Sequence, residues 1–149
     1  MKPGCSNLQK FGARVLAIAL VLATPLSARA ADDSLYKDLG GTEGIVRIVD
    51  DFSDLYLSDE RIKADFEGIN IVHLKKQLVV QFCMLAGGPC AYKGADMKAV
   101  HKGMQISVGQ FNALAEDLQI ALDKQNVPYW AQNRLIALLA AMERDIVTR

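Results

Sequence analysis

Apolar residues recur at helical spacing along most of this 149-residue chain, and no stretch alternates as a half-buried strand does. The first clear segment should begin after Gly40 and Gly41, with Thr42 as its N-cap, and end near Ser58. Its apolar face is formed by Ile45, Ile48, Val49, Phe52 and Tyr56. Helical periodicity without strand signals predicts an all-α domain.

A second helix is expected from a cap at Asn70 to about Ala86, with its apolar stripe formed by Leu74, Leu78, Phe82 and Leu85. Two glycines and a proline at positions 87–89 should end it, because glycine adopts a left-handed turn and proline cannot continue the hydrogen-bond ladder. Residues 91–100 lack a sustained period. We expect a loop there, followed by one short helical turn within residues 97–104.

Two more helices complete the pattern. Ser107 and Gln110 fit a capping box, and the helix they open should bury Phe111, Leu114, Leu118 and Leu122 and stop near Asn126. Pro128 suits the first turn of a last helix, since a missing amide hydrogen costs nothing there. A single stripe in that helix is predicted from Leu135, Leu138, Leu139, Met142 and Ile146.

Residues 1–30 have the pattern of a secretory signal. Lys2, Lys10 and Arg14 are basic, residues 15–26 are apolar but too few to span a bilayer, and Ala28 and Ala30 form an A-x-A cleavage pattern. We expect cleavage after Ala30 and export, into the periplasm of a bacterium, of a domain comprising residues 31–149 without a stable membrane anchor. The alternative is an uncleaved N-terminal anchor.

The net charge gives no reason to expect a nucleic-acid partner. The whole chain has 17 basic and 17 acidic residues, but the first 30 residues hold four of the basic and none of the acidic ones. Residues 31–149 therefore carry a net charge of −4. A mildly acidic domain has no electrostatic attraction to nucleic acid or to an anionic membrane surface.

Two cysteines, Cys83 and Cys90, remain after the expected cleavage, because Cys5 lies in the signal. In an exported protein they could form a disulfide around the glycine pair. The reading preferred from sequence is that Cys83 is a small buried apolar residue and Cys90 a free loop thiol. Covalent haem attachment of the c type is excluded, because no C-x-x-C-H motif occurs.

Few residues offer chemistry. No H-E-x-x-H, P-loop or serine-elbow motif is present, and the adjacent acidic residues are typical of solvated helix surfaces. His101 stands out because Tyr92, Met97, Val100, Met104, Ile106 and Phe111 surround it in sequence and a poorly helical loop precedes it. An imidazole among apolar residues fits a large planar ligand that needs one nitrogen on its iron. A structural histidine in the core of a helical bundle is the alternative.

A set of motifs extends this hypothesis across the whole predicted domain. They are Leu35-Tyr36 with Gly40-Gly41, Asp51-Phe52, Phe66, Gly87-Gly88-Pro89 with Tyr92 and Gly94, Met97 with His101, and Phe111. In this order and spacing they resemble the group 1 truncated haemoglobins. The resemblance implies a truncated globin fold, a two-over-two helical sandwich, and non-covalent haem b.

By the same resemblance His101 is the proximal haem ligand and Phe66 the aromatic residue that stacks on the haem. The other pocket residues it implies are Ile71, Leu74, Lys75, Leu78, Phe82, Tyr92, Met97, Val100, Ile106, Phe111 and Leu114. Lys75 is the candidate for a haem propionate, and a plain surface lysine is the alternative. An imidazole ligand also needs a partner for its second nitrogen, which no sequence pattern identifies.

On the distal side the chain departs from the family. Ser53 stands where group 1 members commonly have a tyrosine, and Leu78 where a glutamine is common. The remaining polar candidates are Ser53, Gln77 and Gln81. Losing one hydrogen bond would weaken a polar bound ligand by roughly 1 to 3 kcal/mol.

The resemblance implies a haem protein that binds or transports oxygen, or binds another small diatomic ligand such as nitric oxide or carbon monoxide. Oxidation of nitric oxide is a further hypothesis, and it needs an electron donor that the sequence does not identify. One alternative is a six-coordinate redox or sensor protein with His73 as the sixth ligand. Another is a haem-free helical module that binds a different apolar partner.

Overall fold

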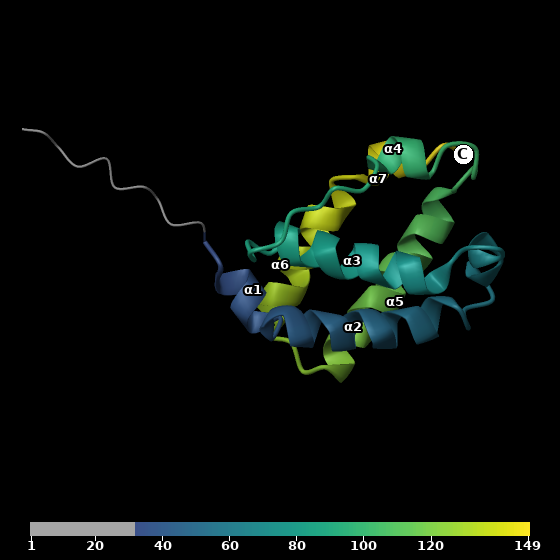
Figure 1. Cartoon of the computed structure of the whole chain (residues 1–149). Coiled ribbons are helices and arrows are strands. Elements are labelled where there is room, and N and C mark those ends of the chain that lie inside the picture. Colours follow the sequence, from purple (N-terminus) through teal and green to yellow (C-terminus); the bar gives the residue numbers. More distant parts are fainter. Residues whose placement is uncertain (1–31) are drawn as a thin grey trace, which may run out of the picture.

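A computed structural model describes residues 32–149 (Figure 1). The predicted signal, residues 1–30, lies outside the described residues. The helices are α1 (Ser34–Asp38), α2 (Gly41–Tyr56), α3 (Ile71–Leu85), α4 (Met97–Val100), α5 (Val108–Lys124), α6 (Tyr129–Ala140) and α7 (Glu143–Ile146), with a 3-10 turn η1 (Lys63–Phe66). The only β-type pairing among these residues is an isolated parallel bridge between Ile106 and Val147. The predicted all-α class is confirmed.

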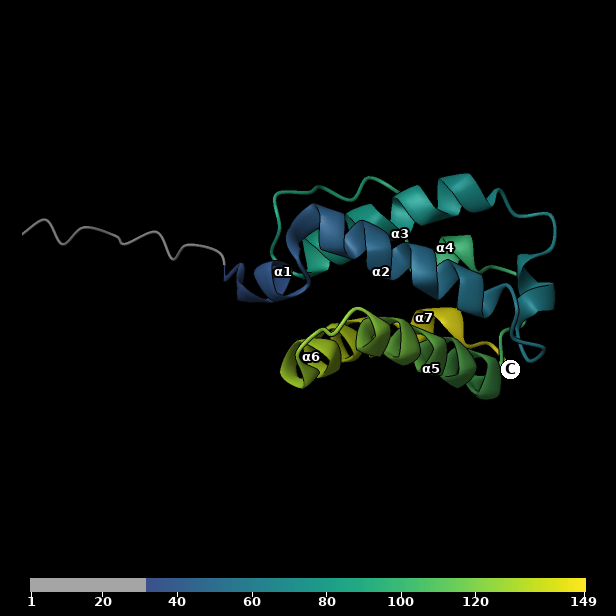
Figure 2. The ribbon, with the colours of Figure 1, turned by 90° about the horizontal axis from the view of Figure 1, so that it is seen from below.

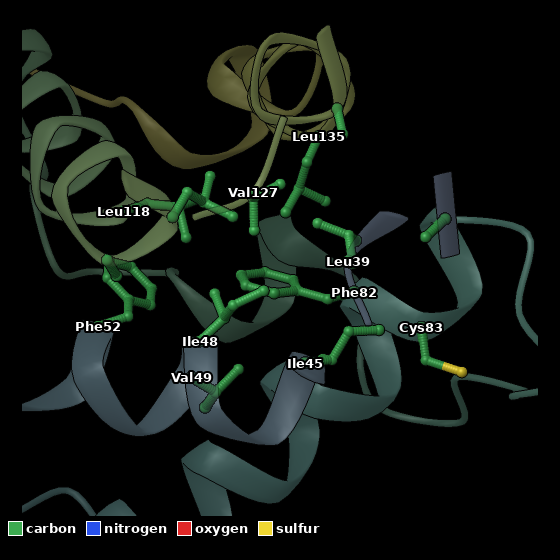
Figure 3. Close-up of a cluster of buried hydrophobic side chains, with 14 of the residues drawn as sticks. Leu39, Ile45, Ile48, Val49, Phe52, Phe82, Cys83, Leu118, Val127 and Leu135 are labelled. Carbon is green, nitrogen blue, oxygen red and sulfur yellow. The ribbon is translucent and has the colours of Figure 1, made fainter. Parts of the chain in front are cut away.

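The long helices form two layers. Helices α2 and α3 make one layer and α5 and α6 the other, with α2 packed on both α3 and α5 (Figure 2). Apolar side chains between the layers form the core, where Ile45, Phe82 and Leu135 meet (Figure 3). This arrangement is the predicted two-over-two helical sandwich. It leaves the segment between α3 and α5 to cover one side of the molecule.

Three predicted helix boundaries are confirmed, and each has a local cause. The side chain of Asn70 accepts a hydrogen bond from the backbone N–H of His73 at the start of α3. Ser107 and Gln110 form the reciprocal capping box of α5. Gly87 has a φ of 81° just after α3, and a Cβ there would lie 2.3 Å from the carbonyl oxygen of Asp32, so only glycine fits.

The first long helix does not use Thr42 as its cap. Gly40, in the left-handed conformation, occupies the N-cap position, and α2 begins at Gly41. The hydroxyl of Thr42 lies 2.7 Å from the phenol oxygen of Tyr36 instead. The prediction was wrong because the contact that engages this side chain comes from another helix.

The last helix is not continuous. Helix α6 ends at Ala140, and α7 follows as a separate turn that packs against α4 (Figure 1). The chain end is held there by hydrogen bonds from the backbone N–H groups of Thr148 and Arg149 to the carbonyl of Ile106. The predicted single stripe is therefore divided, and its two last members, Met142 and Ile146, turn toward the segment that carries His101.

Cys83 and Cys90 form a disulfide, with their Cα atoms 5.8 Å apart. The preferred reading from sequence, a free loop thiol at Cys90, was wrong. The bond ties the buried end of α3 to the loop that leads to α4. No helix in residues 32–149 is both long and apolar enough to cross a membrane.

Candidate haem pocket

A cavity of about 620 Å³ opens between α3 and the segment that carries α4. Its wall also includes residues of α2, η1, the first turns of α5, and Ile146 of α7. A smaller cavity of about 140 Å³ adjoins it, and the two share eight lining residues, among them Phe52, Leu78, Met97 and His101. Volumes of this size suit a large organic ligand or cofactor.

His101 lies at the C-terminal end of α4 and lines both cavities. The side chain of Asp96 caps this short helix by accepting a hydrogen bond from the N–H of Ala99 at 2.8 Å. The ring nitrogen Nδ1 of His101 lies 2.8 Å from the carbonyl oxygen of Met97. Because a carbonyl only accepts, Nδ1 carries the hydrogen, and Nε2 keeps a free lone pair that can bind a metal.

Most of the predicted pocket residues lie on the wall of the larger cavity. Those that do are Phe66, Leu74, Leu78, Tyr92, Met97, Val100, Ile106, Phe111 and Leu114, together with the polar candidates Gln77 and Gln81 and the possible sixth ligand His73. They come from six segments of the chain, namely η1, α3, α4, α5 and the loops on either side of α4. The fold therefore brings together, around one cavity, residues that are far apart in the sequence.

Four predicted residues lie elsewhere. Phe82 lines only the smaller cavity, and Ile71 lines neither. Lys75 pairs with Asp50 of α2 and does not line either cavity. Ser53 is buried and lines neither cavity. Its hydroxyl donates a hydrogen bond to the carbonyl of Val49 at 2.6 Å. These placements differ from the expectation because helix rotation, not sequence order, decides which side chains face the cavity.

Gln81 is the one glutamine of the cavity wall that is buried. Its amide nitrogen lies 3.6 Å from the sulfur of Met97 and 3.7 Å from the sulfur of Met142. Thioether sulfurs are weak acceptors, so this amide is only loosely engaged. His73, in contrast, is exposed at the start of α3, so its imidazole reaches the cavity from the solvent side.

Tyr56 is a cavity residue that sequence reasoning assigned only to the apolar face of α2. It is 1% exposed, and its phenol oxygen has no hydrogen-bond partner within the described residues. Its ring stacks on Phe66, with centroids 4.2 Å apart, and meets Phe52 edge-on at 5.1 Å. Burial raises the pKa of the phenol, and an interaction with the Ser53 hydroxyl partly opposes that shift.

Polar and charged residues lie at the rim of the cavity. Asn70, Lys93 and Asp65 contribute to it. The Asp65 carboxylate accepts a hydrogen bond from the Gln110 amide at 2.8 Å, which ties η1 to the capping box of α5. None of these was predicted as a site residue, since surface polar residues carry no distinguishing pattern in sequence.

These features fit haem. The cavity is large and walled mainly by apolar side chains, as the macrocycle requires, and its rim is polar, as the propionates require. His101 lines it with one ring nitrogen free, because its other ring nitrogen is hydrogen-bonded to the Met97 carbonyl. Among residues 32–149, no group of three or more His, Cys, Asp or Glu side chains is arranged to hold a metal ion.

Comparison with known proteins gives the family. A model of the bacterial-like globins matches residues 34–148, nearly all of the described chain. The chain therefore belongs to the bacterial-like globins.

Within that family its relatives are group 1 truncated haemoglobins. It is 33% identical over 120 residues to group 1 truncated haemoglobin GlbN of Mycolicibacterium paratuberculosis, covering 80% of this chain and 88% of the relative. It is 32% identical to the group 1 truncated haemoglobin of Tetrahymena pyriformis, covering 76% and 94%.

Solved structures agree. The Fe(III) form of the Tetrahymena pyriformis truncated haemoglobin superposes with a TM-score of 0.74 at 31% identity, covering 77% of this chain and 98% of that one. A 2/2 haemoglobin of a Synechococcus species, described with covalently attached haem, gives 0.72 at 24% identity over 77% and 98%. The second likeness supports the fold alone. Membership in this family makes the chain a haem protein that binds small ligands, oxygen among them.

Proposed function

We propose that this protein holds non-covalent haem b through Nε2 of His101 and binds a small diatomic ligand on the opposite face. The observation that carries the proposal is the hydrogen bond between Nδ1 of His101 and the Met97 carbonyl. It directs the ring and leaves Nε2 as the free nitrogen toward the cavity. The bound haem would supply the iron that holds the ligand.

Non-covalent attachment is supported by the residues around the cavity. The two cysteines of residues 32–149 are bonded to each other, and the chain has only two histidines, His73 and His101. Apolar walls from α3 and α5 would hold the macrocycle by burial alone. Lys93 at the rim, free of any ion pair among the described residues, would pair with a propionate.

The test compares the purified haem-loaded protein with His101→Gly by visible absorption, in the ferric and ferrous states and with carbon monoxide. We expect the variant to lose five-coordinate haem and to recover it when free imidazole is added. His73→Gly is the matched control and should keep the wild-type spectrum. Unchanged iron coordination in His101→Gly would contradict the assignment.

A second candidate, a six-coordinate redox or sensor protein, rests on the position of His73 at the cavity. A second imidazole on the iron would favour electron transfer over gas binding. A low-spin ferric spectrum that becomes high-spin in His73→Ala would support it. Protein that takes up no haem at all would favour the third reading, a haem-free binding module.

Oxidation of nitric oxide to nitrate is the proposed reaction if the protein turns over. That reaction uses one dioxygen and one electron for each nitric oxide, so an electron donor is required. The measurement is nitrate formed per nitric oxide added to the oxygenated ferrous protein. Less than one tenth of a stoichiometric yield would limit the function to ligand binding.

We also propose export with removal of the first 30 residues. The support is the basic start, the apolar run of residues 15–26 and the A-x-A pattern, together with a disulfide of the kind that oxidising compartments maintain. Full-length protein expressed in a Gram-negative host should appear in the periplasmic fraction with Ala31 at its N-terminus. Ala30→Arg should block the cleavage, and an uncleaved wild type would contradict it.

A further inference from the structure

We propose that Tyr56 is the distal hydrogen-bond donor of this pocket, its phenol O–H directed to a polar diatomic ligand such as dioxygen. The inference rests on the proposed function, haem-dependent ligand binding, and identifies the residue that would discriminate between ligands. It assigns a role to a side chain that the sequence pattern indicated only as part of the core.

The first argument is the unpartnered phenol. Tyr56 is 1% exposed, so water does not reach its hydroxyl freely, and the phenol oxygen has no hydrogen-bond partner of good geometry among the described residues. An unmade hydrogen bond at a buried hydroxyl costs on the order of 1 to 3 kcal/mol. Buried hydroxyls without a partner are uncommon in folded proteins, and this one belongs to a residue of the cavity wall, so a ligand in the cavity is the candidate for its missing partner.

The second argument is that the ring is held in place. Phe66 stacks on it with an interplanar angle of 24°, and Phe52 contacts its edge at 83°. Both neighbours also line the cavity. A phenol fixed between two aromatic rings has little freedom to swing to solvent, so its hydroxyl position is prepared before a ligand arrives.

The third argument is that the other donors on this side are engaged, absent or, as for Gln77 and His73, outside the buried part of the cavity wall. The Ser53 hydroxyl is used by the Val49 carbonyl, and it lies outside the cavity. Leu74 and Leu78 are apolar. The Gln81 amide is turned to two thioether sulfurs, so it competes only if those contacts break.

The protonation state suits a donor. Burial raises the pKa of the phenol above its ordinary value of 10.0, so the hydroxyl keeps its proton at neutral pH. A neutral phenol can donate to a ligand and cannot bind the iron as a phenolate in that state.

The experiment uses carbon monoxide as the probe of the ferrous haem-loaded protein. We expect Tyr56→Phe to raise the carbon monoxide stretching frequency, because loss of a donor to the ligand oxygen weakens back-donation from the iron. Dioxygen should dissociate roughly 10-fold faster from the variant, the equivalent of one lost hydrogen bond. Replacing H₂O by D₂O should shift the wild-type band and leave the variant band unmoved.

Two control variants separate this role from its competitors. Tyr129→Phe, the same substitution at an exposed position outside both cavities, should leave the frequency unchanged. Gln81→Leu distinguishes the two candidate donors, because a frequency shift in this variant in place of Tyr56→Phe would transfer the role to Gln81 and overturn the inference.

A structural role is tested on the haem-free protein. Tyr56→Phe keeps the ring contacts and removes an unpartnered hydroxyl, so its thermal unfolding midpoint should not fall. An unchanged frequency and dissociation rate in a variant that binds haem normally would overturn the inference about Tyr56 and leave the proposed function intact. Failure of wild type to bind haem would overturn the proposed function, and the inference with it.

Discussion

Apolar side chains form both the core between the helix layers and the wall of the cavity, but they differ in how far they are exposed to solvent. Between the helix layers, Ile45, Leu122 and Leu135 are 0% exposed. On the pocket side, Ile69 is 43% exposed and Val100 49%. Folding alone buries the first group, whereas the second group stays exposed on the cavity wall. We expect bound haem to change the pocket side and to leave the core as it is.

Polar groups differ in the same way. Gln132 is buried in the core, and its amide donates to the Asp123 carboxylate at 2.9 Å and to the Val127 carbonyl at 2.8 Å. Buried Tyr56 has no such partner, and Gln81 has only sulfur atoms. Gln132 in the core therefore has strong partners within the protein, whereas Tyr56 and Gln81 on the pocket side do not.

The largest expected effect is in the core. Leu122→Ala should lower the free energy of unfolding by about 3 kcal/mol, because the closed packing leaves a void that neighbours cannot fill. Chemical denaturation should give the same loss with and without haem. If the loss of unfolding free energy disappeared in the haem-loaded protein, haem would be stabilising the core as well. The contrast between core and pocket would then be wrong.

The disulfide joins the two regions and should rank second. Replacing Cys83 and Cys90 together by alanine should cost about 2 kcal/mol, the chain-entropy value for so short a loop. The single variant Cys90→Ala, which leaves the buried Cys83 thiol in place, is the control for lost packing. Equal stability of wild type with and without reductant would argue against any contribution of this bond.

Leu74→Ala sharpens the contrast with Leu122→Ala, since the chemistry is identical and only the region differs. Leu74 is half-buried on the cavity wall. We expect the haem-free protein to lose less than about 1 kcal/mol, and haem to leave the variant roughly 10-fold faster. The check is transfer of haem to an excess of apomyoglobin, and a stability loss as large as that of Leu122→Ala would contradict it.

The smallest effect concerns an exception in the core itself. Asp117 is 4% exposed with an unpartnered Oδ2, and its pKa is raised by burial and by the nearby Asp59 carboxylate. The folded state therefore binds a proton more tightly than the unfolded chain, and stability falls as pH rises through and above 3.8.

Asp117→Asn removes that charge and should stabilise the protein by up to about 1 kcal/mol at pH 7. The difference should vanish below pH 3.8, where wild type is protonated too. Glu67→Gln, at an exposed position outside the ion pairs of the described residues, is the control and should show no such pH-dependent gain. Destabilisation at pH 7 would mean that the Asp117 carboxylate is paired in solution.

Much of the fold was predictable because its causes are local. Asn70, Ser107 and Gly87 mark helix ends by hydrogen bonds and backbone angles that involve only a few neighbouring residues. The motif set around His101 also identified the family before any geometry was known, since glycine doublets at fixed spacing reflect close backbone approaches. Thr42 failed as a cap because Tyr36, from a different helix, engages its hydroxyl.

The residue sequence by itself determined the helical class, the family and the placement of one histidine after a broken helix. Only the tertiary structure gave His101 its carbonyl partner, paired Cys83 with Cys90, divided the last helix and turned Tyr56 rather than Ser53 into the cavity. The physical reason is the separation in sequence between the residues that determine each feature. Helix periodicity and caps depend on residues about four positions apart, whereas the facing of a side chain depends on how whole helices rotate and pack.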